Sequence, residues 1–146
     1  MKILVDVNVY IDVLTKRAGW EESLRVLNPV RKSPEVEGWT SALTVPLLYF
    51  FRLRIAKEEQ ARADAQASVR GFRLVPLSDT IIRQALASAL PDFEDNIQLA
   101  SAEAIAADYV ITRNKKDFQP AQISILNPEE WLAVEAVARI EADLQR

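Results

Sequence analysis

Short apolar runs alternate with segments of helical periodicity along this chain, and that alternation restricts its fold more than any other feature. Strands of a parallel sheet are buried on both faces, so they read as short runs of apolar and β-branched residues. Helices that cover such a sheet carry one apolar stripe. The alternation predicts an α/β fold, with a central parallel β-sheet of about five short strands flanked by helices on both faces. We expect strands at residues 2–5, 39–40, 72–77, 108–112 and 123–126.

The helices are placed by their periodicity and by residues that start or stop a helix. Ser78 or Asp79 can cap one helix, Asp92 caps the next, and Asn127 precedes Pro128 at the first turn of the last. No repeat or linker divides the 146 residues, so we expect one domain, residues 1–146. The predicted helices are 8–14, 21–30, 44–55, 58–70, 80–90, the segment from Asp92 to 106, and the C-terminal helix 128–146.

The amino-acid composition excludes several kinds of chemistry. The chain has no cysteine, which excludes disulfides and thiolate zinc sites. It has no histidine, which excludes a Ser-His-Asp triad and the commonest general base. A net charge of −3 argues against a broadly basic nucleic-acid-binding protein but leaves room for a local basic patch. The lack of cysteine fits a reducing cytoplasm, where we expect the protein.

Neither the N-terminus nor the most apolar segment predicts an association with membranes. The first residues, MKILVDVNVYIDVL, contain one lysine and place Asp6 within the apolar run, unlike a signal peptide. The apolar segment 43–51 is too short to cross a bilayer and is followed by Arg52 and Arg54.

Three aspartates stand where a strand is expected to end or a helix to begin. Asp6 follows the run 3–5, Asp95 opens an apolar helical stretch, and Asp117 lies just past the run 109–112. Ligands of open α/β sheets bind beyond the carboxyl ends of the strands. Carboxylates gathered there, without histidine or cysteine, suit a hard cation such as Mg²⁺ or Mn²⁺. Because such ions usually act on phosphates, these residues predict a metal-dependent phosphodiesterase.

Each of these acids has a structural alternative. Asp6 or Asn8 can cap the helix that follows, as such residues commonly do. Asp92, Glu94 and Asp95 fall in the first turn of one helix, where the helix dipole favours acids. Residues at i and i+3 share a helix face, so Asp92 and Asp95 can both point at the crevice. Asp12 we interpret as a solvated helix residue or a dipole partner.

The polar segment 112–118 combines an amide, three cations and a carboxylate. It is either a solvated loop or a functional one. In the functional interpretation, Thr112 or Asn114 orients a water molecule and Asp117 ligates or steers a metal. The segment's cations, which are Arg113, Lys115 and Lys116, would meet phosphates.

Four segments together resemble the PIN domain, the nuclease fold of VapC-type toxins. They are VDVNVYIDVL, WTSALTVPLLYFF, DFEDNIQLASAEAIAADYVITRNKKDF and ILNPEEWL. The resemblance implies an acidic Mg²⁺ or Mn²⁺ site and cleavage of single-stranded RNA. It also implies a cognate antitoxin and a homodimer. Matched by position, the implied metal ligands and catalytic acids are Asp6, Asp95 and Asp117, with Asn8 and Asn114 as supporting amides and Thr112 lining the site.

The chain departs from the PIN pattern at one point. PIN nucleases usually carry a glutamate near the start of the helix after the second strand, and Leu47 occupies the best-matching position. Three carboxylates offset three of the four charges of two divalent ions. The sequence therefore predicts one firmly held metal and a weakly held second, unless Glu94, Asp92 or an RNA phosphate supplies the remaining charge.

Three alternatives to an active nuclease can be compared with the sequence. A catalytically weakened PIN module that binds RNA or protein is favoured by the missing glutamate and opposed by the three aspartates. A phosphatase of the haloacid dehalogenase type would need a second aspartate where Asn8 stands. A response-regulator receiver would need a phosphoacceptor aspartate after the strand near residues 75–76, which is absent.

Overall fold

The described residues form a five-stranded, wholly parallel sheet. The computed structural model describes residues 1–30, 34–118 and 121–146. The strand order across the sheet is β3-β2-β1-β4-β5, and every neighbouring pair is parallel. The predicted fold class is therefore confirmed. The strands are β1 (Lys2–Val5), β2 (Glu37–Ser41), β3 (Arg73–Val75), β4 (Tyr109–Ile111) and β5 (Ser124–Leu126).

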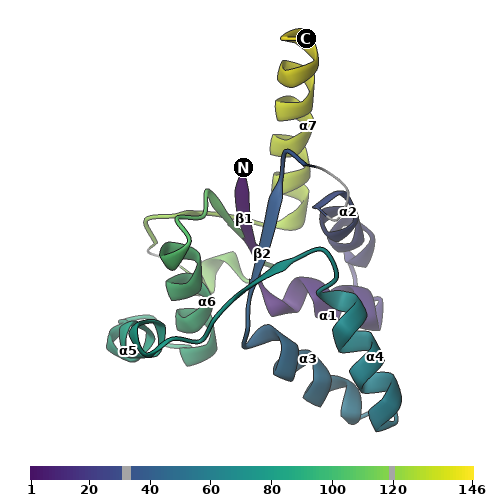
Figure 1. Ribbon diagram of the computed structural model, residues 1–146, viewed down its shortest axis with the longest axis vertical. Helices are drawn as coiled ribbons and strands as arrows, with labels where there is room; N and C mark the ends of the chain where they lie inside the picture. The colour runs from purple at the N-terminus through teal and green to yellow at the C-terminus, as the bar shows by residue number, and fades with distance from the viewer. Residues whose placement is uncertain (31–33, 119–120) are drawn as a thin grey trace.

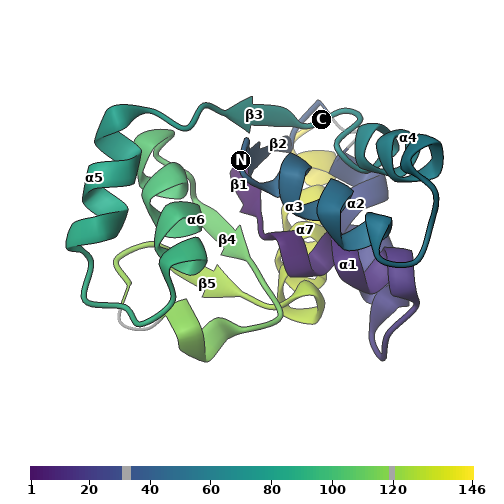
Figure 2. The same cartoon turned by 90° about the horizontal axis from the view of Figure 1, so that it is seen from below.

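Helices cover both faces of this sheet, as Figure 2 shows. Side chains alternate across a strand, so Ile3 and Val5 enter one hydrophobic core while Leu4 enters the other. The first core takes residues from α1 (Val7–Thr15), α2 (Trp20–Val30), α3 (Thr44–Leu53), α4 (Glu58–Ser68) and α7 (Pro128–Leu144). The second takes residues from α5 (Asp79–Ala87) and α6 (Phe93–Ala104).

Two departures from the predicted elements are the largest, whereas the other bounds differ by two residues or fewer. Helix α5 ends at Ala87 instead of residue 90. Ser88 is extended, and its hydroxyl accepts a hydrogen bond from the backbone N–H of Leu90, which competes with helical pairing. Pro91 also disfavours a helical conformation at the residue before it. The segment Lys115–Phe118, expected as an irregular polar loop, is a short 3₁₀ helix, η1.

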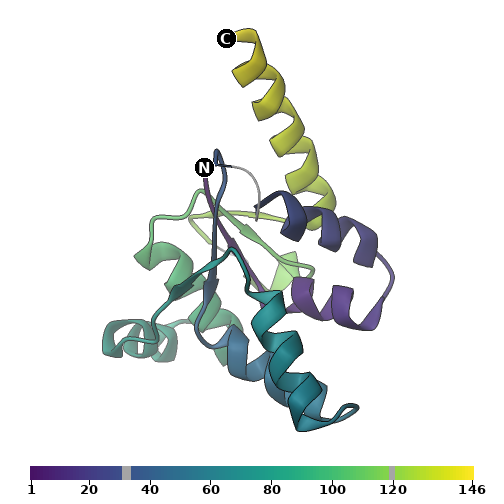
Figure 3. The same cartoon turned by 45° about the vertical axis from the view of Figure 1, so that its right-hand side comes forward.

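The last helix begins at a strong N-terminal signal. The Asn127 side chain accepts from the backbone N–H of Glu130, and the Glu130 carboxylate accepts from the backbone N–H of Asn127. Trp131 in its first turn is fully buried. Later turns extend beyond the sheet (Figures 1 and 3). None of the helices in the described part of the chain is long and apolar enough to cross a bilayer.

The chain order of the strands creates a switch point between β1 and β4. From β1 the chain adds β2 and β3 on one side of the sheet, and then β4 and β5 on the other. The connections therefore diverge at the carboxyl ends of β1 and β4, where open α/β sheets bind their ligands. Asp6 directly follows β1 and Thr112 directly follows β4.

Candidate active site

Asp6 and Thr112 meet at this switch point. Asp6 is buried, with 1% of its surface exposed. Its Oδ2 accepts a 2.8 Å hydrogen bond from the Thr112 hydroxyl, and its Oδ1 accepts one of 2.7 Å from the backbone N–H of Val7. The second bond makes Asp6 the N-cap of α1. The capping role and a role in the site are thus compatible.

Asn8 reaches Asp6 through Thr112. Its Nδ2 donates to the Thr112 hydroxyl over 3.3 Å, and its Oδ1 accepts from the backbone N–H of Arg113 over 3.1 Å. The backbone N–H of Asn114 also donates to the Thr112 hydroxyl, over 3.1 Å. The amide of Asn8 therefore orders the segment after β4 and, through Thr112, the carboxylate of Asp6.

The N-terminus of α6 brings three further acids to the same region. Asp92 is the N-cap, as predicted, and its Oδ1 accepts from the backbone N–H of Asp95 over 3.0 Å. Asp92 and Glu94 are exposed, whereas Asp95 is half-buried. Asp117 lies on η1, where its backbone N–H donates to the Asn114 carbonyl and the neighbouring Phe118 is fully buried in the second core.

The pKa values of two carboxyls show that these acids share one electrostatic field. Burial raises the pKa of Asp6 to about 6, against the lowering effect of the Thr112 and Val7 hydrogen bonds. Burial, together with the negative charges of Asp6, Asp92, Asp117 and Glu94, raises the pKa of Asp95 to about 7. Like charges brought together in a partly desolvated site hold protons more tightly. The pKa values therefore link the acid that follows β1 with acids of α6 and η1 in one site.

The chemistry of this site suits a divalent cation. The donors are hard carboxylate oxygens, which Mg²⁺ and Mn²⁺ prefer, and a cation would offset their mutual repulsion. Across residues 1–30, 34–118 and 121–146, however, no three acidic side chains are close enough to one point to hold an ion. The residue types fit a metal, but closing a ligand sphere requires side-chain rotation.

Asp12 corrects a prediction. We expected a solvated helix residue, but Asp12 is buried, with 2% of its surface exposed. Its Oδ2 accepts from Arg113 Nε over 2.7 Å and from the Ser23 hydroxyl over 2.9 Å, and its Oδ1 accepts from Arg17 Nε over 3.0 Å. A buried carboxylate of this kind requires ionic partners. The sequence signal was available, since Asp12 is the one charged residue on a helix that is mostly apolar.

Arg113, which we predicted to meet phosphates, also has an internal role. Besides Asp12, its guanidinium donates to both carboxylate oxygens of Glu129, at 2.7 and 3.0 Å, and to the Gly19 carbonyl. Gly19 has a φ of +85°, and a Cβ there would lie 2.6 Å from Arg113 Nη2. Arg113 thus joins α1, α2 and α7 to the segment that carries Thr112. Its predicted contact with phosphates stays a prediction.

The two lysines differ in their surroundings. Lys115 Nζ pairs with the Glu130 carboxylate of α7, at 2.8 and 2.9 Å. Lys116 is exposed beside Asp117. Lys116 is therefore the better placed of the two for an incoming anionic ligand.

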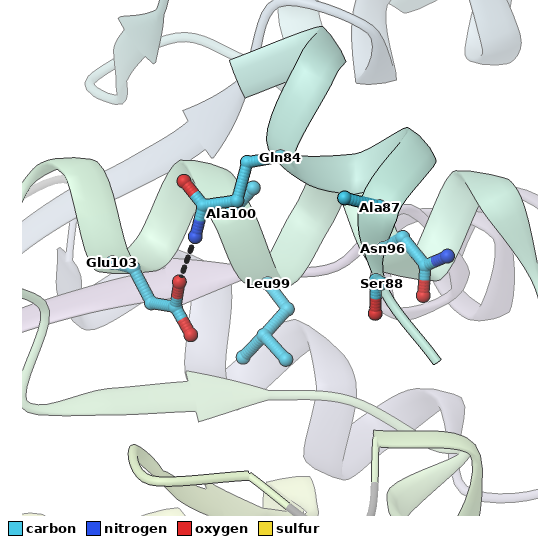
Figure 4. Close-up of a pocket in the computed structure, with 7 residues that line it drawn as sticks. All are labelled: Gln84, Ala87, Ser88, Asn96, Leu99, Ala100 and Glu103. Carbon is cyan, nitrogen blue, oxygen red and sulfur yellow. Dashed lines mark hydrogen bonds between the residues drawn. The ribbon is translucent and has the colours of Figure 1, made fainter. Parts of the chain in front are cut away.

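A hollow between α5 and α6 is separate from this site. It measures about 320 Å³ and is lined in part by Gln84, Asn96, Leu99 and Glu103 (Figure 4). Asn96 follows Asp95 in sequence, but its Nδ2 donates to the Ala85 and Leu90 carbonyls. These adjacent residues of α6 therefore have different roles: Asp95 belongs to the acidic site, and Asn96 holds α5 against α6.

Leu47 occupies the place where an acid was expected. It is half-buried on α3, and the residues of the two hydrophobic cores in the described chain include its neighbours Leu43 and Leu48 but not Leu47. Gln98 of α6 is buried, and its Nε2 donates to the Thr44 hydroxyl at the start of α3 over 3.3 Å. Helix α3 is therefore joined to α6 by neutral polar groups.

A five-stranded parallel sheet with acids at its switch point defines an open α/β protein whose ligand site lies beyond the carboxyl ends of its strands. The PIN domain family model matches residues 2–116, so the chain belongs to the PIN domain family. This match confirms the resemblance found in the sequence. A comparison with curated proteins gives no match.

Several solved structures share this fold. VapBC-1 from nontypeable Haemophilus influenzae aligns with 18% identity and a TM-score of 0.69, covering 88% of this chain and 99% of that chain. A toxin-antitoxin complex from Klebsiella pneumoniae aligns with 23% identity and a TM-score of 0.65, covering 86% of this chain and 97% of that chain. Mycobacterium tuberculosis VapC20, described as a sarcin-ricin loop cleaving toxin, aligns with 16% identity and a TM-score of 0.59. The alignment covers 74% of this chain and 86% of that chain. At these identities the likeness shows the fold, which is that of VapC-type toxins.

Proposed function

We propose that this protein is a metal-dependent endoribonuclease that cleaves single-stranded RNA and acts as the toxin of a toxin-antitoxin pair. The observation that carries the proposal is the shared field of Asp6, Asp95 and Asp117 at the switch point, expressed in the raised pKa values of Asp6 and Asp95. Membership of the PIN domain family supports nuclease activity. The structural neighbour VapC20 from M. tuberculosis, described as a sarcin-ricin loop cleaving toxin, supports the substrate class.

The residues divide the proposed chemistry among them. Asp6 and Asp95 would hold Mg²⁺ or Mn²⁺, with Asp117 completing the set and Asp92 and Glu94 adding negative charge. When bound, such an ion polarises a phosphate oxygen and lowers the pKa of a coordinated water. Thr112, ordered by Asn8, keeps the Asp6 carboxylate oriented.

Cleavage also requires the RNA backbone to be held beside these acids. Lys116, assisted by Lys115, would contact flanking phosphates, and Asn114 would line the entrance between them. Such contacts do not depend on the base sequence and weaken with salt.

Loss of individual carboxylates tests the proposal. Purified protein with millimolar Mn²⁺ should cleave single-stranded RNA, and Asp6→Asn or Asp95→Asn should reduce the rate by roughly 10²-fold or more. The matched control is Asp79→Asn, which changes an exposed acid on α5. Cleavage that persists in both site variants would exclude these residues as the catalytic acids.

A catalytically weakened PIN module is the second candidate. It is favoured by Leu47 in place of an acid and by the open arrangement of the acidic side chains. If the wild-type protein binds Mn²⁺ and single-stranded RNA without cleaving RNA, this function replaces the first.

The partner proteins belong to the same proposal. Several structural neighbours are toxin-antitoxin complexes, which supports a cognate antitoxin. We also propose a homodimer in the cytoplasm, with α3 as one contact, because Phe50 on α3 is 61% exposed. Co-purification of the product of a small adjacent gene, together with inhibition of cleavage, would test the first part. Sedimentation of the wild type and Phe50→Ser would test the second.

A further inference from the structure

The C-terminal half of α7 carries an apolar stripe that its own chain leaves exposed. Val137, Ile140 and Leu144 recur at three- and four-residue spacing, so they lie on one helix face. They are 56%, 60% and 81% exposed. In the first half of the helix, by contrast, Trp131 and Glu135 are buried. The helix is thus anchored at one end and presents its apolar face at the other, where it extends beyond the sheet (Figures 1 and 3).

A hollow continues this stripe toward the body of the protein. It measures about 480 Å³, and Met1 and Tyr109 line it together with Val134, Val137 and Glu141 of α7. Exposed apolar surface beside a hollow of this size is typical of a site that binds another protein.

The charges beside the stripe identify its occupant. Glu141 follows Val137 by four residues and Asp143 follows Ile140 by three, so one acid borders each side. The nearby arginines are held elsewhere: Arg139 pairs with Glu135 over 2.7 Å, and Arg146 pairs with Glu35 over 3.0 Å. A second copy of α7, parallel or antiparallel, would place acids against acids. A partner with basic flanks would instead meet complementary charge.

We propose that the stripe of α7 binds an amphipathic helix of a different protein, in which apolar residues at three- and four-residue spacing are flanked by lysine or arginine. Its apolar residues cover Val137, Ile140 and Leu144, and one enters the hollow beside Tyr109. Its basic residues pair with Glu141 and Asp143. This is helix-in-groove recognition, with the charges selecting the partner.

The proposal is tested with the full chain and two synthetic helices that share the same leucine stripe. One has lysine flanks and the other has glutamate flanks. Fluorescence anisotropy should show binding of the lysine-flanked helix and at least roughly tenfold weaker binding of the glutamate-flanked one. Ile140→Ser combined with Leu144→Ser should weaken the lysine-flanked complex by a similar factor. The matched control is Leu86→Ser, which removes a leucine that is 67% exposed on α5.

Reversing the charges beside the stripe gives an independent test. Glu141→Lys combined with Asp143→Lys should make the protein prefer the glutamate-flanked helix. These residues are exposed, so circular dichroism and melting should match the wild type.

Three results would overturn the proposal. The first is equal affinity for both peptides, or no binding of either. The second is a wild-type dimer in sedimentation that the Ile140 and Leu144 changes dissociate, which would assign the stripe to a second copy. The third is binding to neutral phosphatidylcholine vesicles that the same changes abolish, which would assign it to a lipid surface.

Discussion

The Thr112 hydroxyl donates a 2.8 Å hydrogen bond to the Asp6 carboxylate across 106 positions of sequence. This bond joins the ends of β1 and β4, and it partly offsets the burial that leaves the pKa of Asp6 at about 6. The acidic site is thus held by the same pairing that forms the centre of the sheet. Its ionisation, its metal affinity and the stability of the fold are expected to be coupled.

Replacing Thr112 by valine should raise the pKa of Asp6 further, because the variant lacks the donor that stabilises the charged form. Leaving a buried carboxylate with one fewer partner should also cost roughly 1–3 kcal/mol of stability. The pKa is measured by NMR titration of ¹³C-labelled aspartate, and the stability by urea unfolding. Thr80→Val is the control, since Thr80 is exposed. An unchanged Asp6 pKa would refute the proposed coupling.

Stability without metal should fall as the pH rises from about 4 to about 7. The folded-state pKa values of Asp6, about 6, and Asp95, about 7, lie above the ordinary value of 3.8, so the folded protein binds protons more tightly than the unfolded chain. The stabilisation is complete below the unfolded pKa and is lost as the pH rises through the folded values. Thermal melting at about pH 5 and about pH 8 measures this loss.

Millimolar Mn²⁺ should restore the stability that the protein loses as the pH rises. An ion that binds the folded state raises the melting temperature by mass action. Protons compete for Asp6 and Asp95, so the increase should be larger at about pH 8 than at about pH 5. The Asp6→Asn and Asp95→Asn double variant supplies the control and should respond little to either Mn²⁺ or pH. An equal response to Mn²⁺ in this variant would place the bound ion elsewhere.

Leu47→Glu should strengthen the dependence of cleavage on metal if α3 presents this position to the crevice. A half-buried position outside both cores should accept the charge at modest cost, unlike a core position, where an unpaired charge costs several kcal/mol. The measurements are the cleavage rate against Mn²⁺ concentration and the urea midpoint. Leu48→Glu is the contrasting variant, because Leu48 is fully buried and its change should unfold the protein. A stable Leu47→Glu protein with no gain would mean that a further acid is unnecessary here.

Arg113→Ala should destabilise the fold by roughly 3–5 kcal/mol, because it leaves the buried Asp12 carboxylate without its closest ionic partner. Gly19→Ala should destabilise it less, through the unfavourable φ and the contact with the same guanidinium. Lys116→Ala should leave stability unchanged and reduce the salt dependence of RNA binding. If Arg113→Ala instead keeps wild-type stability and loses RNA affinity, the result would support the predicted phosphate-binding role of Arg113 and contradict its role in stability.

The sequence by itself determined the order and kind of nearly every element. Apolar runs gave the five strands, and the predicted bounds of β1 are those observed. The capping residues Ser78, Asp92 and Asn127 were also recognisable, because their side chains bond to backbone groups only a few positions away. Local chemistry of this kind is readable from a single chain.

The tertiary structure alone decided which distant residues share a charge environment. Asp12 and Arg113 each have a local interpretation in the sequence, one as a solvated acid and the other as a phosphate-binding cation. They form an ion pair because α1, α2 and α7 enclose both. Likewise, the pKa of Asp95 depends on acids from β1 and η1 that only the strand order β3-β2-β1-β4-β5 brings near α6. Burial and long-range charge depend on the packed fold, and neither is encoded by spacing along the chain.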